Sequence, residues 1–412
     1  MKLATTILLV LIITLFTTSV YAETGKVQLV WRNAQDAVMY ELEIADGLIH
    51  GPKEAPEEKV VYTTTAIYTP GVEISLAELD GQDINQLYYR VRPLDLEKNP
   101  VGSFSKPMAV SKGIFNPEKP TPTVSQKKRP SLLYPVYSWI PVLGAERYEI
   151  EVTSRVPENP NGTEPSQFRV RSYSMDSGFD YYDYEAFREA GRYYWRVIAY
   201  DSENQPIGTY SNAVRFKVNT TGYRWATFGD SITHGGGAVS NPPSDERFDY
   251  SYYLPFTVKN LGRSGDTAAM LVERFDNDVL PFQPKYLFIL GGSNSIRGGA
   301  SGEEVIDSLS TIKQKCQDNG IVPIFLTLPP VNPERIELVF NQPTADNWQE
   351  ELAKVNEFLR TQEYVIDIYP VLADENGLLP VKYAQDGLHP DISGKKVIAA
   401  QVNEFLVKNN LR

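Results

Sequence analysis

The chain has little cysteine, little histidine and little clustered basic charge, and each scarcity excludes a class of protein. Its 412 residues include one cysteine, Cys316, so no disulfide can form within the chain and its folds depend on hydrophobic cores. Three histidines limit the candidates for a general base to His50, His234 and His389. A formal net charge of −12 without a basic face argues against a nucleic-acid partner.

Long apolar runs are scarce as well, and the clearest one lies at the N-terminus. Residues 7–16 are apolar except for Thr14, follow the basic Lys2 and precede Val-Tyr-Ala at residues 20–22. This order is typical of a signal peptide, and the run is about half the ~20 residues that a membrane span needs. We therefore predict a signal peptide at residues 1–22, cleavage after Ala22, a secreted or periplasmic protein, and no stable membrane anchor.

The single cysteine lies in a segment with helical periodicity. Between residues 303 and 319 the apolar positions recur every three or four residues, at Val305, Leu309, Ile312 and Cys316. This spacing places Cys316 on the apolar face of a helix, which predicts a buried structural thiol and not a nucleophile.

Two segments that follow the predicted signal peptide resemble each other. The matching pairs are Trp31 with Trp139, residues 40–44 with 148–152, 90–91 with 196–197, and 100–105 with 206–211. The pairs occur in the same order in both segments, 108 residues apart for the first two pairs and 106 residues apart for the last two. This pattern predicts a duplicated unit of about 100 residues.

Both copies have the alternation of short β-strands. Tyr40, Leu42 and Ile44 alternate with charged residues, as does the Tyr-rich segment 194–200, so one face of each strand is apolar. We predict two all-β sandwich modules that resemble fibronectin type III or related immunoglobulin-like units: the first module at residues 23–115 and the second module at residues 116–220. Residues 116–130 are rich in proline and lysine, which predicts a linker between the two modules.

The pattern changes after Tyr223, where apolar strands alternate with helical periods. Predicted strands are residues 225–228, 256–261, 286–290, 322–328 and 365–369; predicted helices are residues 267–279, 302–319, 346–361 and 393–408. This alternation predicts a three-layer α/β domain with a parallel sheet at residues 221–412. Sites in such sheets lie at the carboxyl ends of the strands.

Polar segments follow these strand ends. They are residues 229–237, 260–266 and 291–295. A fourth polar segment, residues 386–390, lies near the C-terminus. Singly, each is compatible with a turn or a helix cap. Together they supply a serine, an aspartate, a histidine and hydrogen-bond donors, which is what acyl transfer requires: a nucleophile, a base, a group that orients the base, and a site for the oxyanion.

The spacing of the histidines favours one of them as the base. Asp386 precedes His389 by three residues, so one turn can bring the carboxylate to the imidazole. His234 has no carboxylate before it at a useful spacing, which favours a structural or substrate-side role, and His50 lies in the first module.

This ordered set resembles the SGNH hydrolases, also called the GDSL esterase/lipase family, over residues 223–410. Ser231 in Gly-Asp-Ser-Ile matches the nucleophile, and Gly265 matches the second-block glycine of the oxyanion hole. Asn294 matches the third-block asparagine, and Asp386 and His389 match the closing pair.

The resemblance implies a flavodoxin-like α/β fold and a serine esterase. Ser231, Asp386 and His389 would be catalytic, and the oxyanion would bind the N–H groups of Ser231 and Gly265 and the Asn294 amide. No metal or cofactor is expected, because no ligand cluster has metal spacing. The sequence departs from the family pattern at Ile232, where leucine is common, and at Ser295, where aspartate is common.

Two modules ahead of the hydrolase-like domain favour a glycan substrate. We expect a secreted enzyme that removes O-acetyl groups from a carbohydrate, with a small-molecule or polysaccharide ester as its partner and with no prediction of oligomeric state. The alternatives are a lipase or aryl esterase of the same family, and a non-catalytic protein that binds glycans. The modules themselves could bind glycan or act as spacers.

Overall fold

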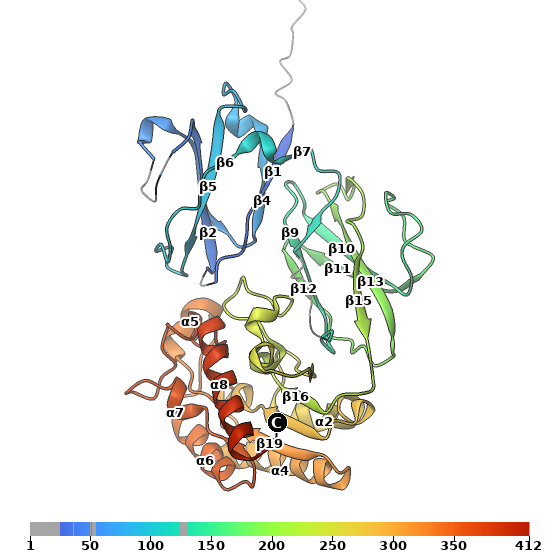
Figure 1. Cartoon of the computed structure of the whole chain (residues 1–412), viewed down its shortest axis with the longest axis vertical. Helices are drawn as coiled ribbons and strands as arrows, with labels where there is room; N and C mark the ends of the chain where they lie inside the picture. The colour runs from blue at the N-terminus through green and yellow to red at the C-terminus, as the bar shows by residue number, and fades with distance from the viewer. Residues whose placement is uncertain (1–24, 36, 50, 52–54, 124–129, 412) are drawn as a thin grey trace, which may run out of the picture.

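The computed structural model arranges the chain as two β-rich modules above an α/β domain (Figure 1). It describes residues 25–411 except 36, 50, 52–54 and 124–129. The predicted signal peptide and His50 lie outside the described residues. The predicted fold class is confirmed: antiparallel sheets come first, followed by a parallel sheet with helices.

The first module contains two antiparallel sheets around one apolar core. Its strands are β1 (Lys26–Val30), β2 (Met39–Asp46), β3 (Val60–Ile67), β4 (Gly71–Ser75), β5 (Leu87–Leu94), β6 (Met108–Ala109) and β7 (Ile114–Phe115). Short 3-10 turns are η1 (Glu57–Lys59), η2 (Leu76–Leu79) and η3 (Val110–Lys112). The sheet orders are β4-β1-β7 and β3-β2-β5-β6. The alternating residues of β1 and β2, such as Leu29 and Leu42, fill the core between the sheets.

The second module repeats this plan. Its strands are β8 (Thr121–Pro122), β9 (Val136–Ile140), β10 (Arg147–Thr153), β11 (Arg169–Asp176), β12 (Asp180–Tyr182), β13 (Gly191–Tyr200), β14 (Pro206–Ile207) and β15 (Val214–Val218). The sheet orders are β12-β9-β8 and β11-β10-β13-β14, with β15 also on β13. Strand β8 lies within the predicted linker and pairs with β9, so this part of the linker belongs to the second module.

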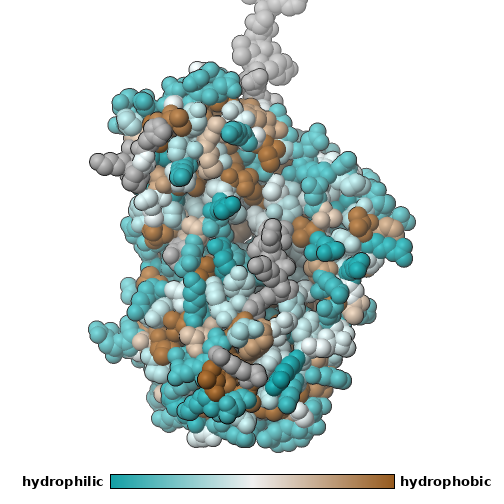
Figure 2. Space-filling model, in the orientation of Figure 1, coloured by the Kyte–Doolittle hydropathy of each residue, from teal (hydrophilic) through white to brown (hydrophobic). Residues whose placement is uncertain are grey.

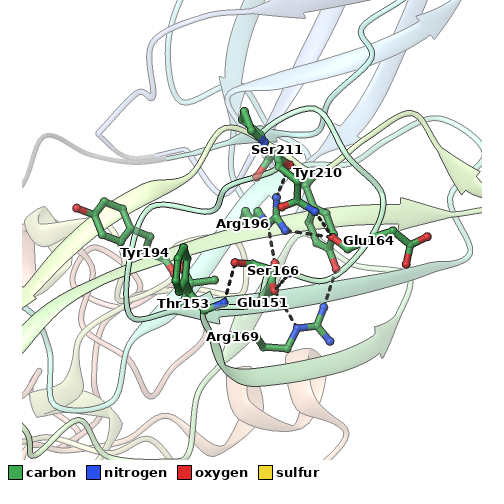
Figure 3. A network of polar contacts seen from close by, with 12 residues as sticks. Glu151, Thr153, Glu164, Ser166, Arg169, Tyr194, Arg196, Tyr210 and Ser211 are labelled. Carbon is green, nitrogen blue, oxygen red and sulfur yellow. Dashed lines mark hydrogen bonds and ion pairs between the residues drawn. The ribbon is translucent and has the colours of Figure 1, made fainter.

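The duplication extends to a buried ion pair in each module. Glu43 on β2 bonds Arg90 on β5, and at the matching positions Glu151 on β10 bonds Arg196 on β13, each at 2.6 Å. In the second module Arg169 also reaches Glu151 (Figure 3). Because each pair joins two neighbouring strands inside one sandwich, its role is structural.

The α/β domain is built on five parallel strands. They are β16 (Trp225–Gly229), β17 (Val258–Asn260), β18 (Tyr286–Leu290), β19 (Val322–Leu326) and β20 (Val365–Ile366), in the order β17-β16-β18-β19-β20. This is the 2-1-3-4-5 order of flavodoxin-like sheets, in which the direction of winding reverses at the first strand. The crevice between the ends of β16 and β18 is therefore where this fold places a site.

Helices connect these strands. They are α1 (Ser231–His234), α2 (Ala268–Asp278), α3 (Ser293–Arg297), α4 (Gly302–Asp318), α5 (Pro333–Phe340), α6 (Trp348–Arg360), α7 (Tyr369–Leu372) and α8 (Ile392–Lys408), with 3-10 turns η4 (Glu246–Phe248), η5 (Tyr250–Tyr253) and η6 (Leu280–Phe282). Helices α2, α4 and α6 contact one another in series, whereas α8 contacts η4 and η5. The four predicted long helices are present, and Cys316 is buried on α4.

The second module and the α/β domain share one hydrophobic core. Leu133, Tyr134 and Ala186 of the second module pack in the same cluster as the side chains of β16 and β18. The first module makes a smaller contact, in which Val38 and Met39 pack against Ala238. On the face shown in Figure 2, apolar side chains form small groups separated by hydrophilic ones. Within the described part of the chain, no helix has the length and apolarity to cross a membrane.

Candidate active site

Ser231 lies directly after β16, where the strand turns into the short helix α1. Asp230 caps this helix, because its Oδ1 accepts the Ile232 N–H at 3.0 Å. The turn packs tightly against β18: a Cβ on Gly229 would lie 1.9 Å from the carbonyl oxygen of Leu290. Beneath α1, the buried Lys395 donates to the Ile232 carbonyl at 2.7 Å, and burial lowers the pKa of Lys395 to about 8.

Three of the predicted site residues form a hydrogen-bonded chain. Asp386 Oδ2 lies 2.8 Å from Nδ1 of His389, and His389 Nε2 lies 2.9 Å from Oγ of Ser231. A carboxylate only accepts, so Nδ1 carries the imidazole proton and Nε2 is left to accept from the serine hydroxyl. This arrangement can deprotonate Ser231.

Asp386 is fully buried and ionised. Burial by itself would raise its pKa, but the charge of His389 and hydrogen bonds to the carboxylate bring the pKa below the usual range. Those bonds include the N–H groups of Leu388 and His389, both 2.8 Å from Oδ1. The carboxylate is therefore fixed in position and keeps the imidazole in one tautomer.

His234 lies in a different setting. Its Nε2 is 2.7 Å from the carbonyl oxygen of Tyr134 and its Nδ1 is 2.9 Å from Oγ of Ser264, so both ring nitrogens are engaged away from Ser231. Burial lowers the pKa of His234 to about 4. It is a neutral residue that joins the second module to the loop after β17, which is the structural one of the two roles that its spacing favoured.

The predicted oxyanion donors line the same pocket as Ser231. Neither the N–H of Ser231 nor that of Gly265 donates to another described residue. Asn294, on α3 after β18, donates one amide hydrogen to the Asp266 carbonyl at 2.9 Å, and its side chain lines the pocket. Ser295, where the family commonly has aspartate, accepts the Ala268 N–H at 2.9 Å and so joins α3 to the start of α2.

Arg274 connects the strand ends that carry these groups. It donates to the carbonyls of Gly229 and Leu261, at 2.9 and 2.8 Å, and pairs with the carboxylates of Asp266 and Asp278. Asp278 is also bonded by Tyr134 of the second module at 2.5 Å. The second module therefore supports the residues that position Asn294.

The pocket around Ser231 has a volume of about 430 Å³ and includes residues that sequence reasoning missed. Tyr182 and Tyr184 of the second module form part of its wall, together with Arg297 at the end of α3 and Phe340 at the end of α5. Phe340 also packs edge-on against the His389 ring at 5.9 Å. No local pattern indicated these residues, because the helix that carries Arg297 was not predicted and the other three are distant from Ser231 in the sequence.

Among the described residues, no group of three or more His, Cys, Asp or Glu side chains could hold a metal ion. The thiol of Cys316 does not line this pocket, and burial raises its pKa to about 12.

Residues 227–397 match the model of the GDSL-like lipase/acylhydrolase family. Similar solved structures include a lipase/acylhydrolase from Enterococcus faecalis (20% identity, 45% of this chain and 96% of that chain, TM-score 0.37). A GDSL-like lipase from Bacteroides thetaiotaomicron is 19% identical, with 46% of this chain and 89% of that chain covered and a TM-score of 0.36. A member of the lipolytic protein G-D-S-L family from Veillonella parvula is also 19% identical, with 44% of this chain and 97% of that chain covered and a TM-score of 0.36. No curated protein matches the chain. Residues 227–397 thus match a GDSL-like lipase/acylhydrolase domain, and this match supports a carboxylic ester hydrolase.

Proposed function

We propose that the protein is an exported serine esterase that removes O-acetyl groups from a carbohydrate, with Ser231, His389 and Asp386 as its catalytic residues. The observation that carries the catalytic assignment is the chain of 2.8 and 2.9 Å contacts from Asp386 through His389 to Ser231, at the mouth of a pocket. The export assignment rests on the signal-like residues 1–22.

The proposed reaction has two stages. His389 Nε2 takes the hydroxyl proton as Ser231 Oγ attacks the ester carbonyl, and the resulting oxyanion accepts from Ser231 N–H, Gly265 N–H and Asn294 Nδ2. The imidazolium returns the proton to the leaving alcohol, and Ser231 is left acylated. Water, deprotonated by His389, then attacks the acyl-enzyme and releases acetate and free Ser231.

Tyr184 supports a carbohydrate substrate. It lies two residues beyond β12, lines the pocket and is 62% exposed, so its ring is available to a ligand. The neighbouring Asp183 is buried and holds this segment, because its carboxylate accepts from the hydroxyls of Tyr137 and Tyr173 at 2.8 Å. An exposed aromatic ring on an anchored segment offers a large contact area, which suits the flat apolar face of a sugar.

The catalytic assignment is tested with Ser231→Ala and His389→Ala. Both should lose hydrolysis of p-nitrophenyl acetate by about 1,000-fold or more, because the nucleophile or its base is absent. Circular dichroism and the thermal midpoint should show that the variants remain folded. Wild-type turnover in either variant would contradict the assignment, and turnover absent from the wild type would favour the non-catalytic binding alternative.

The substrate is tested by acetate release from acetylated polysaccharides, compared with p-nitrophenyl esters of increasing acyl length. We expect acetyl esters to be preferred and Tyr184→Ala to raise KM for the polysaccharide about tenfold, through loss of ring contact. Leu143→Ala, an exposed apolar side chain of the same module outside the pocket, is the matched control. A preference for long acyl chains would favour the lipase alternative instead.

A further inference from the structure

Among the described residues that form the wall of the active-site pocket, Arg297 has the one permanently cationic side chain. The described residues that form the wall include no Asp, Glu or Lys, although the chain as a whole has a net charge of −12. The other ionisable groups there are His389, which bonds Ser231, and the tyrosines of the second module. A ligand in this pocket therefore meets a positive charge that forms no ion pair with a carboxylate in the pocket wall.

The guanidinium of Arg297 lacks the partners that half-buried arginines usually have. Its Nη2 donates weakly to Gln342 at 3.4 Å, and its Nε is buried without a hydrogen-bond partner in the described structure. No carboxylate of the described residues forms an ion pair with it. By contrast, the nearby Arg274 pairs with two carboxylates.

The buried carboxylate of Asp386 interacts with Arg297 through its charge but does not form a hydrogen bond or ion pair with the guanidinium. Its oxygens are occupied by the ring of His389 and by two backbone N–H groups, and its side chain is fully buried. Removing a charged group from water without a partner is costly, so such a group in a binding pocket points to a partner that arrives with the ligand.

We propose that Arg297 binds a carboxylate of the substrate, so that the preferred substrates are O-acetyl esters of acidic sugars. The inference rests on the proposed function and narrows its substrate class. Arg297 lies three residues after Asn294 on α3, which places both on one face of the helix. The carboxylate would therefore lie near the oxyanion donors, on the sugar that bears the ester or on its neighbour.

A planar carboxylate fits the available donors. A guanidinium offers parallel N–H groups that match the two oxygens of a carboxylate, and Nη1 and Nη2 of Arg297 form no ion pair with a carboxylate of the described residues. Phosphate sites gather several cationic or backbone donors, whereas the described wall has a single arginine, and its free N–H groups of Ser231 and Gly265 are those assigned to the oxyanion.

The test compares the full-length protein on two polymers: a partially O-acetylated polyuronic acid, and the same polymer after methyl esterification of its carboxyl groups. The readout is the ratio of kcat/KM for the acidic polymer to that for the esterified polymer. We expect the wild type to prefer the acidic polymer and Arg297→Gln to lower this ratio about 10- to 100-fold. Arg297→Lys keeps the positive charge but loses the paired N–H groups of the guanidinium, so its ratio should lie between those of the wild type and Arg297→Gln.

Arg224→Gln is the matched control, because Arg224 precedes β16 at the opposite end of the strand from Ser231 and is exposed. It should leave the ratio unchanged. An unchanged ratio in Arg297→Gln would overturn the proposal. Acetylglycerol phosphate is tested as a third substrate. If the wild type hydrolyses it with a higher kcat/KM than the acidic polymer, and Arg297→Gln removes that difference, the assignment to a carboxylate would be overturned.

A binding measurement separates this proposal from the proposed function. Titration calorimetry of Ser231→Ala with a uronic acid trisaccharide should show binding that is lost in Ser231→Ala/Arg297→Gln, with equal thermal midpoints for the two proteins. This result would support the anion site even if the wild type released no acetate. Equal binding by both proteins would reject the site whether or not the enzyme is an esterase.

Discussion

Burial gives the two described histidines of the α/β domain different chemistry. His389 is held by an ionised carboxylate and faces Ser231, whereas His234 is enclosed between Tyr134 and Ser264. Both follow loops at the same edge of the sheet, and only one is placed to accept a proton from the serine. The difference arises from their neighbours in space and not from the residue type.

His234 provides a pH-dependent prediction at this scale. Its pKa is about 4 in the folded protein, against 6.5 when unfolded, so the unfolded state binds the proton more tightly. The stability that a neutral His234 contributes is complete above pH 6.5 and is lost as the pH falls toward 4, by on the order of 3 kcal/mol.

The measurement is chemical unfolding of the wild type and His234→Gln between pH 4 and pH 7.5. The difference in unfolding free energy between the two proteins should favour the wild type more at high pH than at low pH. A difference that stays constant over this range would show that His234 does not titrate with folding. The other buried ionisable groups are shared by both proteins and cancel in the difference.

At the scale of elements, the site depends on a close approach between β16 and β18. These parallel neighbours at the winding reversal deliver Ser231 and Asn294 to one crevice. The approach leaves no room for a side chain at Gly229, whose Cβ would also come 2.5 Å from Oγ1 of Thr233. The glycine before the serine is thus a packing requirement of the strand pair.

Gly229→Ala should therefore be severely destabilising. A Cβ at 1.9 Å from a backbone oxygen forces β16 away from β18, and we expect a loss above about 4 kcal/mol or failure to fold. Gly222→Ala is the control: φ is +86° there, but no atom lies within 4 Å of the new Cβ, so conformational strain alone should cost about 1 kcal/mol. Similar unfolding free energies for the two variants would contradict this account.

At the scale of the whole molecule, the second module is part of the hydrolase and not a separate attachment. It places Leu133 and Tyr134 in the core of the α/β domain and Tyr182 and Tyr184 in the pocket wall. The buried Lys259 also donates to the Ser131 carbonyl across this junction at 2.8 Å, and burial lowers the pKa of Lys259 to about 7. These contacts join the second module and the α/β domain into one packed unit.

Residues 221–412 produced alone should consequently be unstable. Removal of Leu133 and Tyr134 exposes core side chains, each worth about 1.5–3 kcal/mol when buried. It also leaves Asp278 without the Tyr134 hydroxyl. We expect aggregation or a thermal midpoint well below that of the full chain. Residues 116–412, which keep the second module, should be more soluble; an equally stable 221–412 fragment would show that the shared core is dispensable.

Local patterns in the sequence determined much of this protein. Helical and strand periods predicted the main elements of the α/β domain, and the internal match of Trp31 with Trp139 predicted the repeat, because such periods depend on neighbours in the chain. The short helices α3 and α5 were not predicted, because segments of five and eight residues are too short to show a clear helical period. The catalytic roles of Ser231, Asp386 and His389 stay a prediction.

Only the tertiary structure decided how the domains combine. No spacing in the chain indicates that Tyr184 reaches a pocket built around Ser231, or that the α/β core includes Tyr134. The unpaired state of Arg297 and the enclosed state of His234 likewise depend on which side chains surround them. Contacts between residues so distant in sequence follow from packing of whole surfaces, and a local residue pattern does not encode which surfaces meet.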